Sequence, residues 1–135
     1  MQKTFFQRNW YFFTPAAILA IPMIMGFYSM VSWGYSFKES MTALVHFGST
    51  DTRYSVGFTE DRFRLLKPGM DGRKVYEVVK NPFERQNDDT LWRYSLPQDN
   101  ATYYHERAVI LEKDAQGIPR VKQVIRRFHT PDMKP

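Results

Sequence analysis

The sequence predicts an α+β protein in which one N-terminal transmembrane helix precedes a small domain of two short helices packed on a three-stranded antiparallel sheet. Residues 9–37 contain no Asp, Glu, Lys or Arg, although the mean hydropathy of the whole chain is −0.49. Val75, Val78 and Val79 recur at helical spacing, and strand-like apolar runs follow residue 90. A length of 135 residues suits one modest domain beside such a helix.

The charge-free segment comes first. An apolar stretch of about 20 residues, at 1.5 Å per residue, matches the hydrocarbon thickness of a bilayer, about 30 Å. We therefore expect a transmembrane helix with aromatic belts over residues 10–37. Amphipathic rings prefer the headgroup level, so four residues are candidate interface anchors. They are Trp10, Tyr11, Trp33 and Tyr35.

A cleaved signal peptide is the alternative interpretation. The apolar stretch is too long for one, and no clean small-x-small cleavage site follows it, so an uncleaved signal anchor is favoured. Lys3 and Arg8 precede the stretch, and the positive-inside rule then predicts a cytoplasmic N-terminus over residues 1–9. The expected location is the bacterial inner membrane, with the C-terminal domain in the periplasm.

Small side chains on the helix would allow another helix to approach closely. They are Ala16, Ala17, Ala20, Gly26 and Ser29. We interpret them as candidates for packing against a partner helix, with plain anchoring as the alternative.

Residues 38–58 are expected to be a linker or stalk, with a short helix possible over residues 39–46. Thr59 can cap a first short helix. Asp71 can cap a second helix, whose apolar face is Val75, Val78 and Val79 and which stops at Asn81-Pro82.

Three strands follow, bounded by turn residues. They are expected over residues 91–96, 103–112 and 121–128, with a turn at Asp114–Gly117 between the last two. Residues 129–135 are expected to form a flexible tail.

This order of elements, and the residues themselves, resemble the SmpA/OmlA (BamE-like) domain family over residues 59–128. The resemblance is carried by DRFRLL, KPGMDGRKVYEVVKNP, LWRYSL and VILEKDAQGIPRVKQV. It implies a two-helix, three-strand domain and, as a function, accessory work in outer-membrane β-barrel assembly. Lipidated members need a cysteine after the signal. This chain has none and carries the predicted helix instead.

No arrangement of residues predicts catalysis, and we expect no enzyme activity, cofactor or metal. The three histidines lack ligand spacing, there is no cysteine, and no phosphate loop or hydrolase motif occurs. A membrane-anchored enzyme using His105, Glu106 or Asp88-Asp89 stays as a minor hypothesis. The net charge of +5 is too evenly mixed to predict nucleic-acid binding.

Two groups of residues are candidate protein-docking surfaces. The aromatic group is Trp92, Tyr94, Tyr103 and Tyr104, and the basic group is Arg120, Lys122, Arg126 and Arg127. Core packing and edge solubility are their ordinary explanations.

The sequence thus predicts a non-catalytic, single-pass accessory or assembly subunit of a larger integral membrane complex, which would be photosynthetic, respiratory or transport-related. A barrel-assembly envelope biogenesis factor is the alternative.

Overall fold

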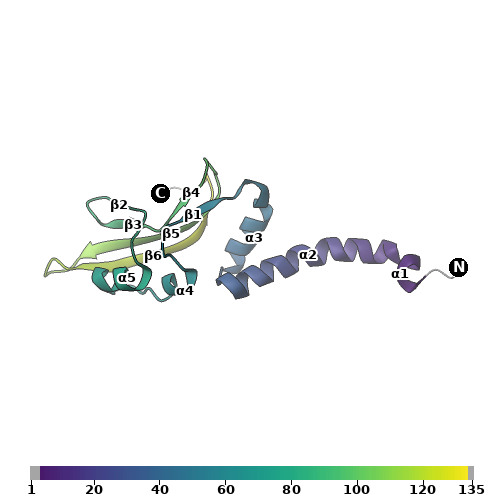
Figure 1. Ribbon diagram of the computed structural model, residues 1–135, viewed down its shortest axis with the longest axis horizontal. Helices are drawn as coiled ribbons and strands as arrows, with labels where there is room; N and C mark the ends of the chain where they lie inside the picture. The colour runs from purple at the N-terminus through teal and green to yellow at the C-terminus, as the bar shows by residue number, and fades with distance from the viewer. Residues whose placement is uncertain (1–3, 134–135) are drawn as a thin grey trace. The chain divides into compact units, whose positions relative to one another are not determined.

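The computed structural model describes residues 4–133 and divides the chain into two compact units, Met1–Leu44 and Val45–Pro135 (Figure 1). Lys3, used for the orientation prediction, and the last two residues of the expected tail lie outside the described residues. The fold class is mixed α+β, with one long apolar N-terminal helix and a small sheet domain.

The first unit is helical. It contains α1 (Phe5–Arg8), α2 (Trp10–Trp33) and nearly all of α3 (Phe37–Val45). The 24-residue α2 is long and apolar enough to cross a membrane, as a membrane anchor or a signal sequence would be. It ends four residues earlier than expected because Gly34 adopts a left-handed conformation (φ 63°), which favours glycine after a helix.

Helix α3 folds back on α2. The Ser36 hydroxyl accepts a hydrogen bond from the Glu39 amide at 3.1 Å, and the Ser29 and Ser40 hydroxyls lie 2.9 Å apart. Gly26 is buried, and a Cβ atom there would lie only 2.8 Å from the Cε atom of Met41. The glycine therefore leaves room for the end of the Met41 side chain, which would have to move to admit a larger residue.

The second unit begins with structure where a linker was expected. A 3₁₀ turn (Phe47–Ser49) precedes β1 (Thr52–Tyr54), which pairs antiparallel with β4 (Ser95–Pro97). The His46 ring stacks on Tyr103, with ring centroids 3.9 Å apart. The segment 38–58 thus contains most of α3, where a short helix was considered possible, and the strand β1, whose three residues are too few to show a periodicity.

Two short helices follow, as expected. They are α4 (Glu60–Phe63) and α5 (Gly72–Val79). The Asp71 carboxylate caps α5 by accepting a hydrogen bond from the Arg73 amide at 2.8 Å. The loop between the helices is tied to the sheet, because the Gly69 amide donates to the Val121 carbonyl at 2.7 Å.

The sheet differs from the expected three strands. Four antiparallel strands occur in the order β2 (Glu84–Gln86), β3 (Leu91–Arg93), β5 (Tyr104–Lys113) and β6 (Pro119–His129), beside the two-stranded β1–β4 sheet. The predicted strand 91–96 is interrupted at Tyr94, so its halves join different sheets. The additional strands have three residues each, too short to show a period.

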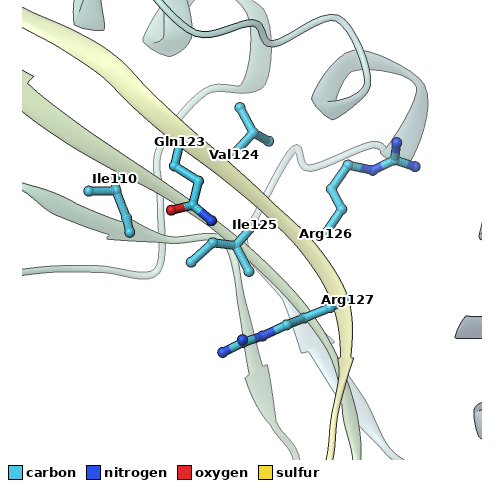
Figure 2. Close-up of a pocket in the computed structure, with 6 residues that line it drawn as sticks. All are labelled: Ile110, Gln123, Val124, Ile125, Arg126 and Arg127. Carbon is cyan, nitrogen blue, oxygen red and sulfur yellow. The ribbon is translucent and has the colours of Figure 1, made fainter. Parts of the chain in front are cut away.

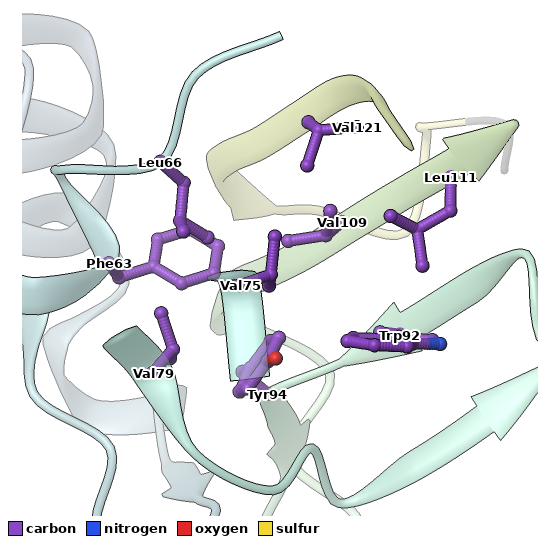
Figure 3. Packing of buried hydrophobic residues seen from close by; sticks show 9 residues of the cluster. All are labelled: Phe63, Leu66, Val75, Val79, Trp92, Tyr94, Val109, Leu111 and Val121. Carbon is purple, nitrogen blue, oxygen red and sulfur yellow. The ribbon is translucent and has the colours of Figure 1, made fainter. Parts of the chain in front are cut away.

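The core lies between α4, α5 and one face of the four-stranded sheet (Figures 1 and 3). Its buried side chains are Phe63, Leu66, Val75, Val79, Trp92, Tyr94, Val109, Leu111 and Val121. Each fully buried aliphatic or aromatic side chain contributes about 1.5–3 kcal/mol relative to an exposed one. The opposite face of the sheet is left without helical cover within this unit.

Candidate functional site

Most of the predicted aromatic docking group is buried. Trp92, Tyr94 and Tyr104 are each at most 5% exposed, so their side chains cannot contact a partner. Trp92 also donates its indole N–H to the Asp89 carboxylate at 2.8 Å. Tyr103 is half-buried beneath His46. The aromatic docking prediction is therefore wrong for these three residues, which serve the interior of the unit.

Burial also changes the chemistry of two of these tyrosines. Desolvation raises the pKa of Tyr94 well above its ordinary value of 10.0. The pKa of Tyr104 is raised by desolvation and, to a smaller extent, by the Glu106 carboxylate. Both phenols are held neutral by the fold.

Each residue of the basic group has an acidic partner. Arg120 pairs with Asp114 at 2.7 Å and Lys122 with Glu112 at 3.2 Å. Arg126 pairs with Glu60 at 2.9 Å and Arg127 with Glu106 at 2.5 Å. The pairs made by Arg126 and Arg127 are only partly exposed, so these two side chains are held in fixed positions.

Glu60 connects α4 to the sheet, which the sequence did not predict. Besides Arg126, its carboxylate accepts hydrogen bonds from the Nε atom of Arg107, a residue with no exposed surface. The signal in the sequence was an arginine directly preceding the apolar run Ala108–Leu111. A charge at such a position in a strand needs a partner, since unpaired buried charge is costly.

Alternate residues of β5 and β6 lie on the face of the sheet opposite the core. Alternation places Ile110 away from the buried Val109 and Leu111, and its cross-strand neighbour is Gln123. Ile125 and Arg127 continue this face along β6.

These residues line a hollow of about 330 Å³ (Figure 2). Its lining is Ile110, Gln123, Val124, Ile125, Arg126 and Arg127, which we call the β6 hollow. Five consecutive residues of one strand line it, and β6 is the last strand in the sheet order. The hollow therefore follows the outer edge of the sheet. On the face opposite the core it combines branched aliphatic surface with the guanidinium of Arg127, which Glu106 holds, whereas Arg126 extends to the helix side and pairs with Glu60 (Figure 2).

The predicted helix-packing residues fall into two sets. Ala16, Ala17 and Ala20 are exposed on α2. Gly26 is buried and Ser29 is half-buried, and both contact α3 of the same chain, so α3 already occupies this part of the helix. Of the candidate interface anchors, Trp10, Tyr11 and Trp33 are exposed and Tyr35 is half-buried.

The residues of the enzyme hypothesis do not converge. His105 and Glu106 are neighbours on β5, so their side chains leave opposite faces of the strand. Asp89 accepts the Trp92 indole N–H and pairs with Arg85 at 3.4 Å. Within residues 4–133, no group of three or more His, Asp or Glu side chains is arranged to hold a metal ion.

Comparison with known proteins adds no relative. No family model, curated protein or solved structure matches this chain.

Proposed function

We propose that this chain is a single-pass, non-catalytic accessory subunit that stabilises a larger integral membrane protein complex. The observation that carries the proposal is α2 itself, whose large apolar side chains are exposed along its length. In water such a surface would aggregate, whereas lipid or a neighbouring helix would cover it. The helix is a signal anchor in this proposal, with a cytoplasmic N-terminus in the bacterial inner membrane and the second unit in the periplasm.

Partner contact in the membrane is assigned to Ala16, Ala17 and Ala20. Ala16 and Ala20 are one turn apart and exposed, and small side chains let two helix backbones approach closely. Gly26 and Ser29 already contact α3 of the same chain. The exposed alanines in the N-terminal half of α2 are therefore the small residues that another helix could reach.

Partner contact outside the membrane is assigned to the β6 hollow. Ile110 and Ile125 offer apolar surface, and Arg127 beside them offers a guanidinium that is held by Glu106. Aliphatic surface with a positioned arginine is typical of interface centres. The partner surface is expected to be apolar with a carboxylate or carbonyl facing Arg127.

The experiment is recovery of the tagged full chain from native membranes in mild detergent, with mass spectrometry of proteins that stay bound through size-exclusion chromatography. Ala16→Leu with Ala20→Leu is expected to reduce recovery of one integral complex. Ile18→Phe with Met25→Phe adds bulk on the opposite side of α2 and is the matched control.

The β6 hollow is tested in the same assay. Gln123→Arg places a large charged group in the hollow without removing an internal contact and is expected to reduce recovery. Gln116→Arg makes the same change in the exposed β5–β6 turn and is expected to have no effect. A chain that elutes alone in its native form, or equal recovery for every variant, contradicts the accessory-subunit function.

A second candidate is envelope biogenesis of the barrel-assembly type. It is favoured by the elements that carried the SmpA/OmlA resemblance, since α4, α5, β3, β5 and β6 occur in that order and the Gly69-Met70 turn contacts Val121. Outer-membrane fractionation, or recovery with barrel-assembly subunits, would select this function over the first.

A further inference from the structure

The positive charge of the second unit is concentrated in one segment. Residues 60–80, which hold α4 and α5, contain six basic and four acidic residues. The rest of residues 45–133 contains nine basic and nine acidic residues. A charge of +2 therefore belongs to the helical layer, while the remainder of the described unit is neutral when histidine is counted as uncharged.

The outer side of α5 is charged and is flanked by an aromatic ring. Gly72, Val75 and Val79 face the core, so Arg73, Lys74 and Glu77 line the outer side, where Lys74 and Glu77 pair with each other. Tyr76, at the flank of this side, is 43% exposed and amphipathic, a type of side chain that suits the boundary between lipid and water. Lys80 follows directly after the helix and is also exposed, so the ring of Tyr76 has a cation before it and one after it in the sequence.

Other residues of the same layer add to this surface. Arg62 and Lys67 flank the exposed Leu65 after α4. Val56, which is 91% exposed, lies in a turn whose next residue, Gly57, approaches the Lys80 side chain. In the part of the chain that the structure describes, Arg62, Lys67, Arg73 and Lys80 have no carboxylate within ion-pair distance. The helical layer thus offers four uncompensated cations interspersed with apolar side chains.

We infer that this surface, defined by Arg62, Leu65, Lys67, Arg73, Tyr76 and Lys80 and called here the helix-layer surface, binds the headgroups of anionic lipids. The inference rests on one part of the proposed function, which is that α2 anchors the chain in a membrane. It adds a second membrane contact, made by the unit outside the bilayer, and fixes which side of that unit faces the lipid.

Lipid fits this surface better than a second protein does. Only residues 34–59 separate the candidate membrane helix from α4, so an anchored unit stays close to a bilayer at all times. Cations near an anionic bilayer each contribute a modest attraction that needs no shaped pocket. With the helix-layer surface toward lipid, the β6 hollow on the opposite face of the sheet points away from the bilayer and is left for a protein partner.

The test uses the full chain, whose lack of native cysteine allows single-site labelling. Asn81→Cys places a fluorophore beside Lys80, and Gln123→Cys places one on the opposite face; both positions are exposed. Each labelled protein is reconstituted into phosphatidylcholine vesicles with or without phosphatidylglycerol, and quenching by nitroxide-labelled lipids reports proximity to the bilayer. We expect quenching at residue 81 that requires phosphatidylglycerol and is lost in high salt, and little quenching at residue 123.

Charge removal gives the matched comparison. Removing one cation near an anionic bilayer weakens binding about fivefold. Arg73→Gln with Lys80→Gln is therefore expected to lower the ratio of bilayer-bound to unbound second units at least tenfold. Lys113→Gln with Lys122→Gln removes the same charge from the β5–β6 hairpin and is expected to leave quenching at residue 81 unchanged.

Three results would overturn the inference. They are equal quenching at residues 81 and 123, quenching independent of phosphatidylglycerol, and quenching that appears only after membrane proteins are added, which would assign the surface to a protein. Each concerns the reconstituted chain, so the inference can fail while partner recovery succeeds. Extraction of the chain from vesicles by alkaline carbonate would instead reject the anchor, and with it the proposed function.

Discussion

The Nε atom of Arg107 lies 2.9 Å and 3.0 Å from the two carboxylate oxygens of Glu60, 47 residues earlier in the chain. This pair joins the first turn of α4 to the middle of β5 on the core side of the sheet. Arg107 has no exposed surface, and Glu60 is 14% exposed. The pair therefore fixes where α4 lies on the sheet, in a place where neither charge is well hydrated.

Removing the acidic partner is expected to destabilise the unit strongly. Glu60→Gln removes the carboxylate that pairs with the fully buried Arg107 guanidinium, and breaking a buried ion pair typically costs about 3 kcal/mol in the free energy of unfolding. Asp61→Asn is the matched control, since Asp61 is exposed and its pair with Arg64 is worth about 0.5 kcal/mol or less. Urea unfolding in mild detergent, followed by hydrogen exchange of β5, measures both. Equal effects would show that the buried pair is not structural.

The α2–α3 contact is expected to depend on the size of residue 26. Gly26→Leu introduces a side chain where even a Cβ atom meets Met41, so α3 should separate from α2 and its amides should exchange faster with solvent. Adding Met41→Ala makes room and should restore part of the protection. Ala20→Leu changes an exposed position on the same helix and leaves α3 protected. Unchanged exchange in Gly26→Leu would disprove the contact.

The β5–β6 turn is expected to weaken in acid. Asp114 accepts hydrogen bonds from Arg120 Nε and from the amides of Gln116 and Ile118, and these hold its pKa below the ordinary value of 3.8. A lowered pKa stabilises the folded state above pH 3.8, and that contribution is lost as the pH falls through the folded-state value. The free energy of unfolding of Asp114→Asn should fall less steeply than that of the native chain below pH 4. Parallel curves would contradict this role.

Alkaline conditions are expected to destabilise the second unit through Tyr94. In the unfolded chain this phenol ionises near pH 10, whereas burial raises its pKa in the folded chain. The stabilising contribution of neutral Tyr94 is complete below pH 10 and is lost as the pH rises above it. Tyr94→Phe should reduce the slope of unfolding free energy against pH in this range, and Tyr76→Phe, at an exposed ring, should retain it. The same slope in both variants would refute the assignment.

What the sequence predicted correctly depended on repeated patterns. The charge-free run identified α2, and Asp71 with the spacing of Val75 and Val79 identified α5, because a cap and a period reinforce each other over several residues. Strands β1 and β2 were missed, and β4 was joined to β3 in one predicted strand, since three residues are too few to establish alternation. These short strands form because they pair with other segments of the chain, and a pattern within three residues does not indicate such pairing.

The candidate site was harder to predict than the fold. Trp92 and Tyr94 suggested a binding surface by residue type, whereas their shared face is the core. The arginines at 126 and 127 were correctly placed on the last strand, but their partners, Glu60 and Glu106, come from distant positions. Charge reversal at either arginine would break an ion pair inside the unit, so a loss of docking could reflect a loss of folding. Gln123 is therefore the better position for a docking variant.

The pairing of β1 with β4 also has a mechanical consequence. The chain passes from the helical segment into the second unit through residues held by three cross-strand pairs, the Thr50–Tyr103 bridge and the His46–Tyr103 stack. The β5–β6 hairpin, by contrast, has ten paired positions. A pull on the helical segment would reach β1 first, so β1 would open while the hairpin and the core behind it stayed intact. The entry to the second unit is thus the part of it that extends most readily under force.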